Sequence, residues 1–411
     1  MKLSTFGKKL TSGSGIVGLM EDLGAALNEN PDMIFMGGGN PARIPEMEAI
    51  FNAQYAKLAQ SSEQLYSTTG VYQSPQGELG FRRDIANMLK CQFGWQVSEA
   101  NIAVSNGSQS AFYILFNLLA GQMPDGAFKS IHLPQTPEYI GYNDLGLSEK
   151  FFSASKPEIE LIGDHQFKYH VNFDELEIDD KTAALCVSRP TNPTANVLTD
   201  GEISHLDRIA QQADIPLIID GAYGVPFPNI NFVKAQAHWN NNTILVLSLS
   251  KLGLPGVRTG IVVANEQVVK AFSSANTVIN LASGNIGPSL TSDLFASGQI
   301  VELSRRYVKP FYHQRSQQVM ALFQRAMIDI PCRIHLSEGA IFLWLWFEGL
   351  PISSEVLYQR LKRRGVLVVS GHHFFAGIDS HWRHQYECIR VSYVQDLSEI
   401  EQGVKIIAED A

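Results

Sequence analysis

The feature that most constrains the fold is an alternation of short apolar runs and helical patterns through the middle of the chain. Strands are predicted at residues 101–105, 131–133, 183–187, 216–220, 243–249 and 260–264, and helices at 109–119 and 199–212. Thr199 or Asp200 provides an N-cap for the second helix. Short apolar strands separated by helices are typical of a mostly parallel sheet with both faces covered. We therefore expect an α/β fold.

The C-terminal part has a different pattern. A long helical stretch at 300–327 is followed by apolar segments at 339–347, 365–369 and 387–393, with helices at 354–364 and 397–409. This order is typical of a smaller α+β domain. A chain of 411 residues also exceeds the usual size of one domain. We expect a large domain at 60–300 and a small domain built from 301–411 together with 1–59, which also forms an N-terminal arm.

Charge and apolar patterning exclude several functions. The net charge of −9 gives no basic surface for nucleic acid or an anionic membrane. The longest apolar runs, 243–249 and 340–347, are too short to cross a bilayer, and residues 1–20 lack the apolar core of a signal peptide. The four cysteines are scattered without a CxxC pair. Free thiols in the cytoplasm are the interpretation that these features favour.

Other noticeable residues have ordinary structural interpretations. His372, His373, His381 and His384 fit no zinc spacing and are expected in a polar surface loop, so no metal is expected. Trp344 and Trp346 alternate with apolar residues, as in a core strand, and the basic run 362–364 suits a helix C-terminus. The glycines at 37–39 do not form a GxGxxG after a strand, so they do not indicate a dinucleotide loop.

Polar residues follow four of the predicted strands. These residues are Asn106-Gly107-Ser108, Asn192, Asp220 and the segment from Ser248 to Lys251. Ligands bind beyond the carboxyl ends of the strands in open α/β sheets. The sequence therefore predicts one site at this edge.

Lys251 is the central residue of that site. It follows a buried strand, and a lysine among apolar neighbours has a lowered pKa, which makes its amine a nucleophile able to form a Schiff base. Gly107-Ser108-Gln109 opens a helix whose N-terminus suits a phosphate, together with Ser248 and Arg258. Asp220, at the end of its strand, is either an N-cap or turn residue or a carboxylate that keeps a pyridine nitrogen protonated, and Tyr223 follows it closely.

The ordered set of motifs resembles the fold type I pyridoxal-phosphate-dependent aminotransferases of classes I and II. The motifs are Gly37–Pro41, Tyr72 with Gly77, Ser105–Gln109, Pro190–Thr194, Asp220 with Ala222 and Tyr223, Ser248–Lys251 with Arg258, and Arg390. They cover nearly the whole chain. The resemblance implies that fold, pyridoxal 5′-phosphate as cofactor, and a homodimer.

The resemblance also implies a role for each matching residue. Lys251 would hold the cofactor and move the substrate proton. Asp220 would pair with the pyridine nitrogen, while Tyr223 and Asn192 bind the ring oxygen. The remaining cofactor contacts would be Tyr139, stacked on the ring, and Gly107, Ser108, Gln109, Ser248 and Arg258, around the phosphate. Tyr72 would reach the phosphate of the neighbouring subunit, and Arg390 and Gly39 would bind the substrate carboxylate.

A closer resemblance is to bacterial members of the family that transfer the amino group of valine to pyruvate. It rests on residues 36–47, 137–142, 167–171, 186–193, 222–228, 248–256 and 338–347. It implies a ping-pong reaction that yields 3-methyl-2-oxobutanoate and alanine. No second arginine can be assigned to bind a carboxylate on the substrate side chain, which also favours a neutral substrate.

Ala195 departs from the family, which usually has glycine after the Asn-Pro-Thr motif. If this position needs a positive φ, alanine costs about 1 kcal/mol of folding free energy or somewhat more.

Two other functions stay open from the sequence. Another aminotransferase, or a lyase or decarboxylase of the same fold that acts on a neutral amino acid, needs most of the same residues. A cofactor-binding regulator without turnover is also conceivable, but residues before Gly37 show no basic recognition helix of a DNA-binding segment. Ammonia release distinguishes a lyase from a transaminase, and absence of turnover with bound cofactor distinguishes a regulator.

Overall fold

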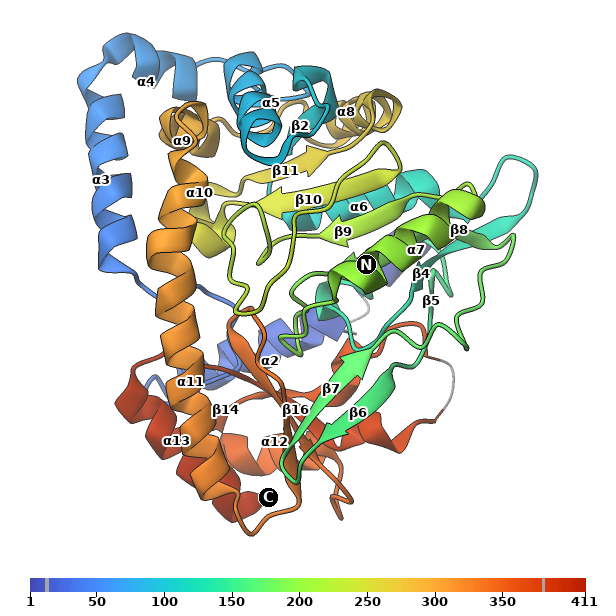
Figure 1. The fold of residues 1–411 in the computed structure, drawn as a ribbon, viewed down its shortest axis with the longest axis vertical. Coiled ribbons are helices and arrows are strands. Elements are labelled where there is room, and N and C mark those ends of the chain that lie inside the picture. The colour runs from blue at the N-terminus through green and yellow to red at the C-terminus, as the bar shows by residue number, and fades with distance from the viewer. Residues whose placement is uncertain (12–14, 379–380) are drawn as a thin grey trace.

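The strands of the computed structural model form a large sheet and a second, smaller one (Figure 1). The model describes residues 1–11, 15–378 and 381–411. Within this part the large sheet has the order β2-β11-β10-β9-β8-β4-β3, with β5 beside β4. Its strands are β2 Ile102–Ser105, β3 Gly121–Gln122, β4 Phe128–Leu133, β5 Phe152–Ala154, β8 Thr182–Ser188, β9 Leu217–Asp220, β10 Thr243–Ser248 and β11 Gly260–Val263.

The large sheet is mostly parallel, as predicted, with one antiparallel strand inside it. Strands β10, β9, β8, β4 and β5 pair in parallel. Strand β11 is antiparallel to both β10 and β2. The connection between β10 and β11 holds only two 3₁₀ turns, η3 Ser250–Leu252 and η4 Pro255–Val257. It is too short for the crossover helix that a parallel neighbour requires.

The chain also forms many helices around the two sheets. The α-helices are α1 Thr5–Leu10, α2 Gly15–Glu29, α3 Pro45–Gln60, α4 Ser62–Thr69, α5 Leu79–Phe93, α6 Ser108–Leu119, α7 Asp200–Gln212, α8 Glu266–Asn280, α9 Ile286–Ala296, α10 Gln299–Leu303, α11 Lys309–Ala326, α12 Ser354–Arg363 and α13 Leu397–Asp410. Further 3₁₀ turns are η1 Glu99–Asn101, η2 Ile140–Tyr142, η6 Gly371–Phe374 and η7 Arg383–Tyr386.

Both faces of the large sheet are apolar and buried. In β8, Leu185 and Val187 pack in one cluster with α7, while Ala184 and Cys186 pack in another with α6 and α8. Successive side chains of a strand point to opposite faces, so each face receives half of the strand. This explains why these strands are continuous apolar runs in the sequence.

The second sheet has the order β15-β16-β13-β12-β7-β6 in the described residues. Its strands are β6 Glu158–Ile162, β7 Gln166–His170, β12 Cys332–His335, β13 Phe342–Phe347, β15 Val369–Ser370 and β16 Cys388–Ser392; β1 Ile34–Phe35 and β14 Val366–Leu367 pair separately. The sequence did not predict β6 and β7. They lie in the range 60–300, yet β7 pairs with β12 of the C-terminal part. The proposed domain ranges stay a prediction.

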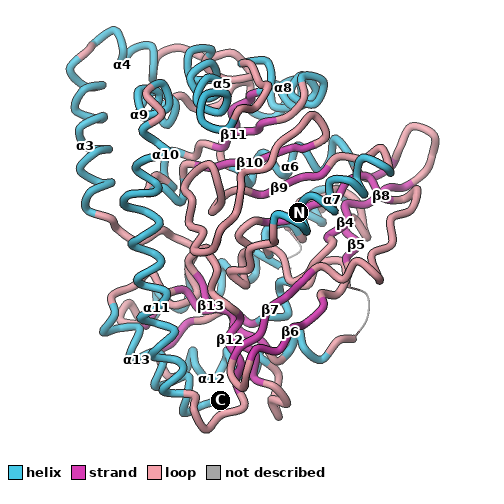
Figure 2. The backbone as a smooth tube through the Cα atoms, in the orientation of Figure 1, coloured by secondary structure: helices cyan, strands magenta, loops and turns pink. Residues whose placement is uncertain are grey.

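The helical stretch expected at 300–327 is interrupted. It consists of α10, a π-helical turn at Ser304–Val308 and α11. Pro310, in the first turn of α11, has no N–H to donate to an earlier carbonyl, which favours a wider turn before it. Figure 2 shows these segments as one column that runs alongside both sheets.

Helix α2 lies between the two sheets in Figure 1 and was not predicted from the sequence. Its Asp22 accepts hydrogen bonds from Tyr358 and Lys362 of α12. The backbone N–H of Ile16 donates to the Asp144 carboxylate at 3.1 Å. These contacts fasten α2 to both parts of the structure.

A buried ion pair of the second sheet holds a loop that follows a strand of the large sheet. Lys168 of β7 pairs with Glu338, which lies between β12 and β13, and it donates to the Asn196 side chain at 3.0 Å. Glu338 accepts the backbone N–H of Val197 at 3.0 Å. The pair therefore holds the loop after β8, which carries Asn192, against the second sheet.

Ala195 lies in the same loop and has the conformation that its family position suggested. Its φ is +64°, and its methyl group is fully buried. The left-handed conformation costs about 1 kcal/mol for alanine. Burial of the methyl group contributes roughly 0.8 kcal/mol, so the two effects nearly cancel. The turn keeps its hydrogen bond from Ala195 N–H to the Thr191 carbonyl at 2.9 Å.

The prediction that the C-terminal histidines lie in a polar surface loop is wrong for His384. This residue is buried and hydrogen-bonded to the Tyr169 hydroxyl. Besides the ring of Tyr169, four aromatic rings of the described residues surround it, because its segment packs on the second sheet: Phe167, Trp346, Phe375 and Trp382. Trp344 is buried in β13 as predicted. No helix in the described ranges is long and apolar enough to cross a bilayer.

The ion pair between Lys168 and Glu338 gives a stability prediction. Lys168→Met should lower the free energy of unfolding by about 3–5 kcal/mol, because it leaves a buried carboxylate without its cation. The double variant Lys168→Met, Glu338→Gln should recover part of this loss, since glutamine is neutral and still accepts from Val197. Urea denaturation followed by tryptophan fluorescence measures both. Equal losses in the single and double variants would contradict the assignment.

Candidate active site

The carboxyl ends of three parallel strands bring the predicted site residues together. Ser188 of β8 lies opposite Asp220 of β9, which lies opposite Val246 of β10. A pocket opens beyond this edge, and α2 and Phe35 form part of its opposite wall. It is lined by these predicted residues: Gly39, Ser108, Gln109, Tyr139, Asn192, Asp220, Tyr223, Ser248, Lys251, Arg258 and Arg390. Gly107 and Tyr72 do not line it.

Lys251 projects from η3, directly after β10, into the pocket. Its Nζ donates to the Gly39 carbonyl and lies 5.3 Å from the centre of the Tyr223 ring. Burial lowers the pKa of Lys251 to about 8, and the charge of Arg390 acts in the same direction. The charge of Asp220 opposes them. A substantial share of the amine is therefore neutral near pH 8.

Asp220 is buried at the end of β9 and faces the pocket. Its Oδ2 accepts from the Tyr142 hydroxyl at 2.7 Å, and its Oδ1 accepts from the Ala222 N–H at 2.9 Å. Burial raises the pKa of Asp220, while these two hydrogen bonds and the charge of Lys251 oppose the rise. A cation placed beside this carboxylate would stabilise its charged form.

A second buried carboxyl lies behind Asp220 and was missed in the sequence. Glu138 accepts hydrogen bonds from the N–H and hydroxyl of Ser188, and Ser188 Oγ lies 3.4 Å from the Tyr142 hydroxyl oxygen. Burial raises the pKa of Glu138 to about 8, with a further rise from the charge of Asp220. The sequence segment 137–142 contains Glu138 and Tyr142, but only Tyr139 was given a role because their burial is invisible there.

Arg258 and the start of α6 form the side of the pocket expected to bind phosphate. Arg258 is exposed, and its Nη1 donates a long hydrogen bond of 3.4 Å to the Pro255 carbonyl. Its guanidinium lies against Gly107, where a Cβ would be 2.3 Å from Nη2. Gly107 is thus required by this close approach and by its φ of +88°. Ser108 is the first residue of α6 and lines the pocket. The backbone N–H groups of the first turn of α6 lie near it, and such groups suit a phosphate.

Gln109 and Ser248 have partners within the chain. The Gln109 side chain donates to the Gly141 carbonyl at 3.0 Å, which ties α6 to η2. Ser248 donates to the Ser250 hydroxyl at 2.9 Å and accepts from the Ser250 N–H. Ser250 also lines the pocket and was not singled out from the sequence. These hydroxyls lie on the same side as Arg258.

Arg390 reaches the pocket from β16 of the second sheet. It donates from Nη1 to the Asn192 side-chain oxygen at 2.8 Å and from Nη2 to the Gly37 carbonyl at 2.7 Å. Its Nε is buried and has no partner among the described residues. Its guanidinium lies 4.2 Å from the centre of the Phe342 ring. Burial lowers the pKa of Arg390 to about 10, so it stays charged at neutral pH.

The other predicted residues have distinct places. Tyr139 lines the pocket and packs edge-on against Tyr142, with ring centroids 5.4 Å apart. Asn192 is buried and bonded to Arg390. Gly39 lines the pocket near Lys251. Tyr72 is 82% exposed, after α4 and away from this pocket.

The N-terminal helix α2 supplies a wall that the sequence reasoning missed. Its apolar side chains in the pocket are Ile16, Leu19, Met20, Leu23 and Leu27. Their spacing along the helix was a readable signal, since apolar residues three or four apart share one helix face. What that face packs against could not be read from the same pattern.

Comparison with known proteins identifies the family. The model of aminotransferase class I and II matches residues 148–407. The chain belongs to the class I and II aminotransferases. It is 49% identical to the valine–pyruvate aminotransferase of Escherichia coli K12 over 100% of this chain and 98% of that protein. This family membership, with the two-sheet architecture, confirms the predicted fold type I and an enzyme of the aminotransferase class.

Two solved structures share both sequence and fold with the chain. A putative amino-acid aminotransferase from Psychrobacter arcticum 273-4 is 44% identical, with a TM-score of 0.96, over 100% of this chain and 98% of that one. The valine–pyruvate aminotransferase of Salmonella typhimurium LT2 is 47% identical, with a TM-score of 0.88, over 95% of this chain and 98% of that one.

Pyridoxal 5′-phosphate is the cofactor of this family, and the pocket residues fit it. The buried Asp220 carboxylate suits a protonated pyridine nitrogen. The guanidinium of Arg258 and the start of α6 suit a phosphate. The amine of Lys251 lies in the same pocket and interacts electrostatically with both Asp220 and Arg258.

The charges around Lys251 give a pH prediction. In protein freed of cofactor, the rate of Lys251 modification by a small aldehyde should rise roughly tenfold per pH unit and level off above about pH 8, because only the neutral amine reacts. Borohydride trapping and mass spectrometry of the Lys251 peptide measure this rate. Arg390→Met should move the profile to higher pH, and Asp220→Asn should move it to lower pH. Shifts in the same direction would refute this electrostatic account.

Proposed function

We propose that the protein transfers the amino group of valine to pyruvate and forms 3-methyl-2-oxobutanoate and alanine. The observation that carries this proposal is one pocket in which a single amine, Lys251, shares the lining with the buried Asp220 carboxylate and the buried Arg390 guanidinium and feels the charge of both. The similarity to valine–pyruvate aminotransferases supports the choice of substrates.

The residues of the chain divide the work by charge. Asp220 holds the pyridine nitrogen in its protonated form, and Tyr142 orients Asp220 by its hydrogen bond. Asn192 and Tyr223 would bind the ring oxygen of the bound cofactor, and Tyr139 would contact its ring. Ser108, Gln109, Ser248 and Arg258 hold the phosphate, with Gly107 giving Arg258 its place. The bound cofactor supplies an electron sink for the carbanion formed at the substrate Cα.

Lys251 moves the proton in both halves of the reaction. Its amine would accept the proton from the substrate Cα in the first half-reaction and would deliver a proton to Cα of the accepting oxo acid in the second. Arg390 binds the substrate carboxylate with two donors and so fixes which bond at Cα faces Lys251. The backbone N–H of Gly39 adds a donor to the same carboxylate. The second half-reaction repeats these steps in reverse with pyruvate.

The pocket favours a neutral, apolar side chain. Its charged lining residues in the described ranges are Lys251, Arg258, Arg390 and Asp220, and each already has a role. No further cation is available there for a side-chain carboxylate. Helix α2 instead provides an apolar wall through Leu19, Leu23 and neighbouring side chains. A branched aliphatic side chain fits such a wall.

We also propose that the protein is a homodimer in which Tyr72 reaches the phosphate in the partner's site. Exposed apolar side chains cluster near the end of α4 and around the α8–α9 connection: Tyr66, Val71, Tyr72, Val278, Ile279, Leu281 and Ile286. A hydrogen bond of 2.9 Å from Thr68 to Ser289 links these two segments. An apolar surface of this kind is typical of a protein interface.

The free cysteines of the described residues support the cytoplasm as the location of the protein.

The proposed activity predicts a strict stoichiometry. Purified holoenzyme should form one alanine for each valine consumed with pyruvate, without ammonia. Lys251→Ala should lower kcat by at least roughly 10²–10⁴-fold, because the proton carrier is lost. Lys405→Ala, at an exposed lysine of α13, is the matched control and should keep full activity. Amino-acid analysis of timed samples measures both.

Three results would overturn this function in different ways. Ammonia in place of alanine would indicate a lyase. Full turnover by Lys251→Ala would show that Lys251 is not the proton carrier. Absence of turnover by protein that retains its cofactor would favour a regulator.

The apolar wall predicts a specificity change. Leu23→Ala should lower kcat/KM for valine about tenfold relative to alanine, because one or two lost methylene contacts are worth about 1–3 kcal/mol. Glu21→Ala, on the exposed side of the same helix, should leave that ratio unchanged. Initial rates with both donors and 2-oxobutanoate as the common acceptor measure the ratio, since alanine with pyruvate gives no net reaction, and the thermal midpoint of each variant checks its fold. An unchanged ratio for Leu23→Ala would place the side-chain pocket elsewhere.

A further inference from the structure

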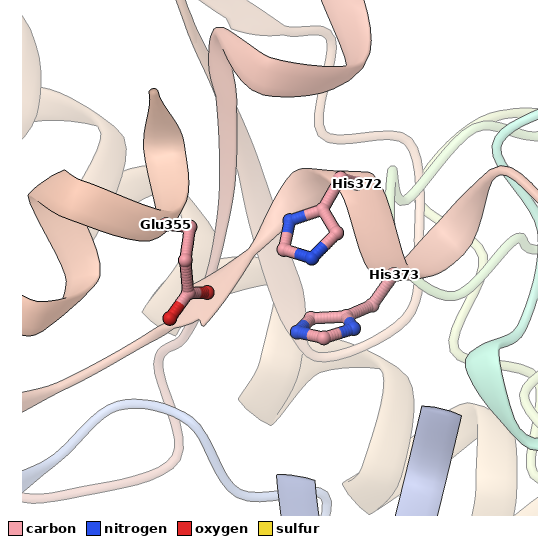
Figure 3. Close-up of side chains that lie close together, drawn as sticks. All are labelled: Glu355, His372 and His373. Atoms are coloured by element: carbon pink, nitrogen blue, oxygen red, sulfur yellow. The ribbon is translucent and has the colours of Figure 1, made fainter. Parts of the chain in front are cut away.

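Two histidines and a glutamate lie together outside the pocket. Glu355 is in the first turn of α12, and His372 and His373 are in η6, directly after β15. One ligand atom from each of the three residues lies within 4.8 Å of the others. Figure 3 shows the two imidazole rings one above the other, with the Glu355 carboxylate beside them. None of the three lines the active-site pocket.

His372 is oriented by a chain of hydrogen bonds. Its Nδ1 lies 2.8 Å from the Ser370 hydroxyl, which lies 2.8 Å from the Ser354 hydroxyl. Both serines are buried. This leaves Nε2 of His372 for another partner. Metal-bound histidines commonly have such a hydrogen bond at the second ring nitrogen, because it fixes the ring and its tautomer.

His373 and Glu355 leave further ligand atoms free. The centroid of the His373 ring lies 4.0 Å from that of the His372 ring, with the two planes tilted by 36°, and neither His373 nitrogen has a hydrogen-bond partner among the described residues. Burial lowers the pKa of His373 to about 4, so its ring is neutral at physiological pH. Glu355 accepts a hydrogen bond from Gln359 at Oε1, and its Oε2 has no such partner in the described ranges. All three residues are half-buried.

We propose that Glu355, His372 and His373 bind a divalent transition metal of the zinc class, with the remaining coordination position open to water. Two imidazoles and a carboxylate suit zinc, nickel or cobalt, whereas magnesium and calcium prefer oxygen ligands alone. Ligand atoms around tetrahedral zinc are about 3.3 Å apart for bonds near 2.0 Å. Binding would therefore require side-chain rotations that shorten the present separations, which lie within 4.8 Å.

The site lies behind the arginine of the active-site pocket. Phe374 ends η6, and its ring centre is 5.2 Å from the Arg390 guanidinium. Its carbonyl accepts the Glu138 N–H at 2.9 Å. A metal bound at the start of η6 therefore fixes the turn that supports both Arg390 and the Glu138–Tyr139 segment. The proposed role is structural, and it does not depend on the substrate of the pocket.

Calorimetric titration of the metal-free holoenzyme with zinc chloride, without substrate, tests the proposal. Cys91→Ser is the background for every variant, because the Cys91 thiol is exposed and could bind zinc itself. We expect one zinc ion per chain. His373→Ala and Glu355→Gln should each weaken the affinity at least about tenfold, and Ser370→Ala about tenfold through loss of the hydrogen bond that orients His372. His165→Ala, at an exposed histidine between β6 and β7, should change nothing.

A second measurement does not depend on affinity. Cobalt chloride should give visible d–d absorption, beyond the cofactor band, that is lost in His373→Ala and kept in His165→Ala. Thermal midpoints show whether each variant is folded. The proposal is overturned if wild-type protein binds no zinc at 0.1 mM (roughly the weak limit for a specific site), or if folded His373→Ala and Glu355→Gln bind as tightly as wild type.

Discussion

A buried guanidinium between the two sheets is the interaction on which the site depends. Arg390 comes from β16, but its hydrogen-bond acceptors are Asn192 of the large sheet and Gly37 of the N-terminal segment. No carboxylate of the described residues pairs with it, and the faces of Phe342 and Phe374 offset only part of the cost of burying its charge. A substrate carboxylate would complete this environment. The same residue thus joins three segments and, in the proposed function, selects a ligand with a carboxylate.

The large sheet supplies the opposite charge. Asp220 is buried at the end of β9, and the pKa of Glu138 behind it is raised to about 8 because the two carboxyls share an apolar surrounding. Glu138 is therefore mostly neutral at pH 7, while two hydrogen bonds and the charge of Lys251 favour the charged form of Asp220, which faces the pocket. Tyr142 and Ser188 connect them by hydroxyl groups. This arrangement keeps one negative charge next to the amine of Lys251 and close to where a pyridine nitrogen would lie.

Segments distant in sequence determine the shape of the pocket. Helix α2 adds the apolar wall, and its Asp22 is fastened to α12 of the C-terminal part. The pair between Lys168 and Glu338 holds the loop of Asn192 in place, and that loop accepts alanine at φ +64° because its methyl group is buried. Substrate preference thus depends on contacts between segments.

The sequence by itself determined the mostly parallel sheet, the strand ends and the residues Lys251, Asp220 and Arg390, because local apolar periodicity and ordered motifs record them directly. Only the tertiary structure decided the pairing of β7 with β12, the antiparallel β11, the burial of His384 and the place of Glu138 and α2. It alone brought Glu355 to the two neighbouring histidines. The physical reason is that pairing, burial and pKa depend on which surfaces meet in space, and residues far apart in the chain leave no local pattern of that meeting.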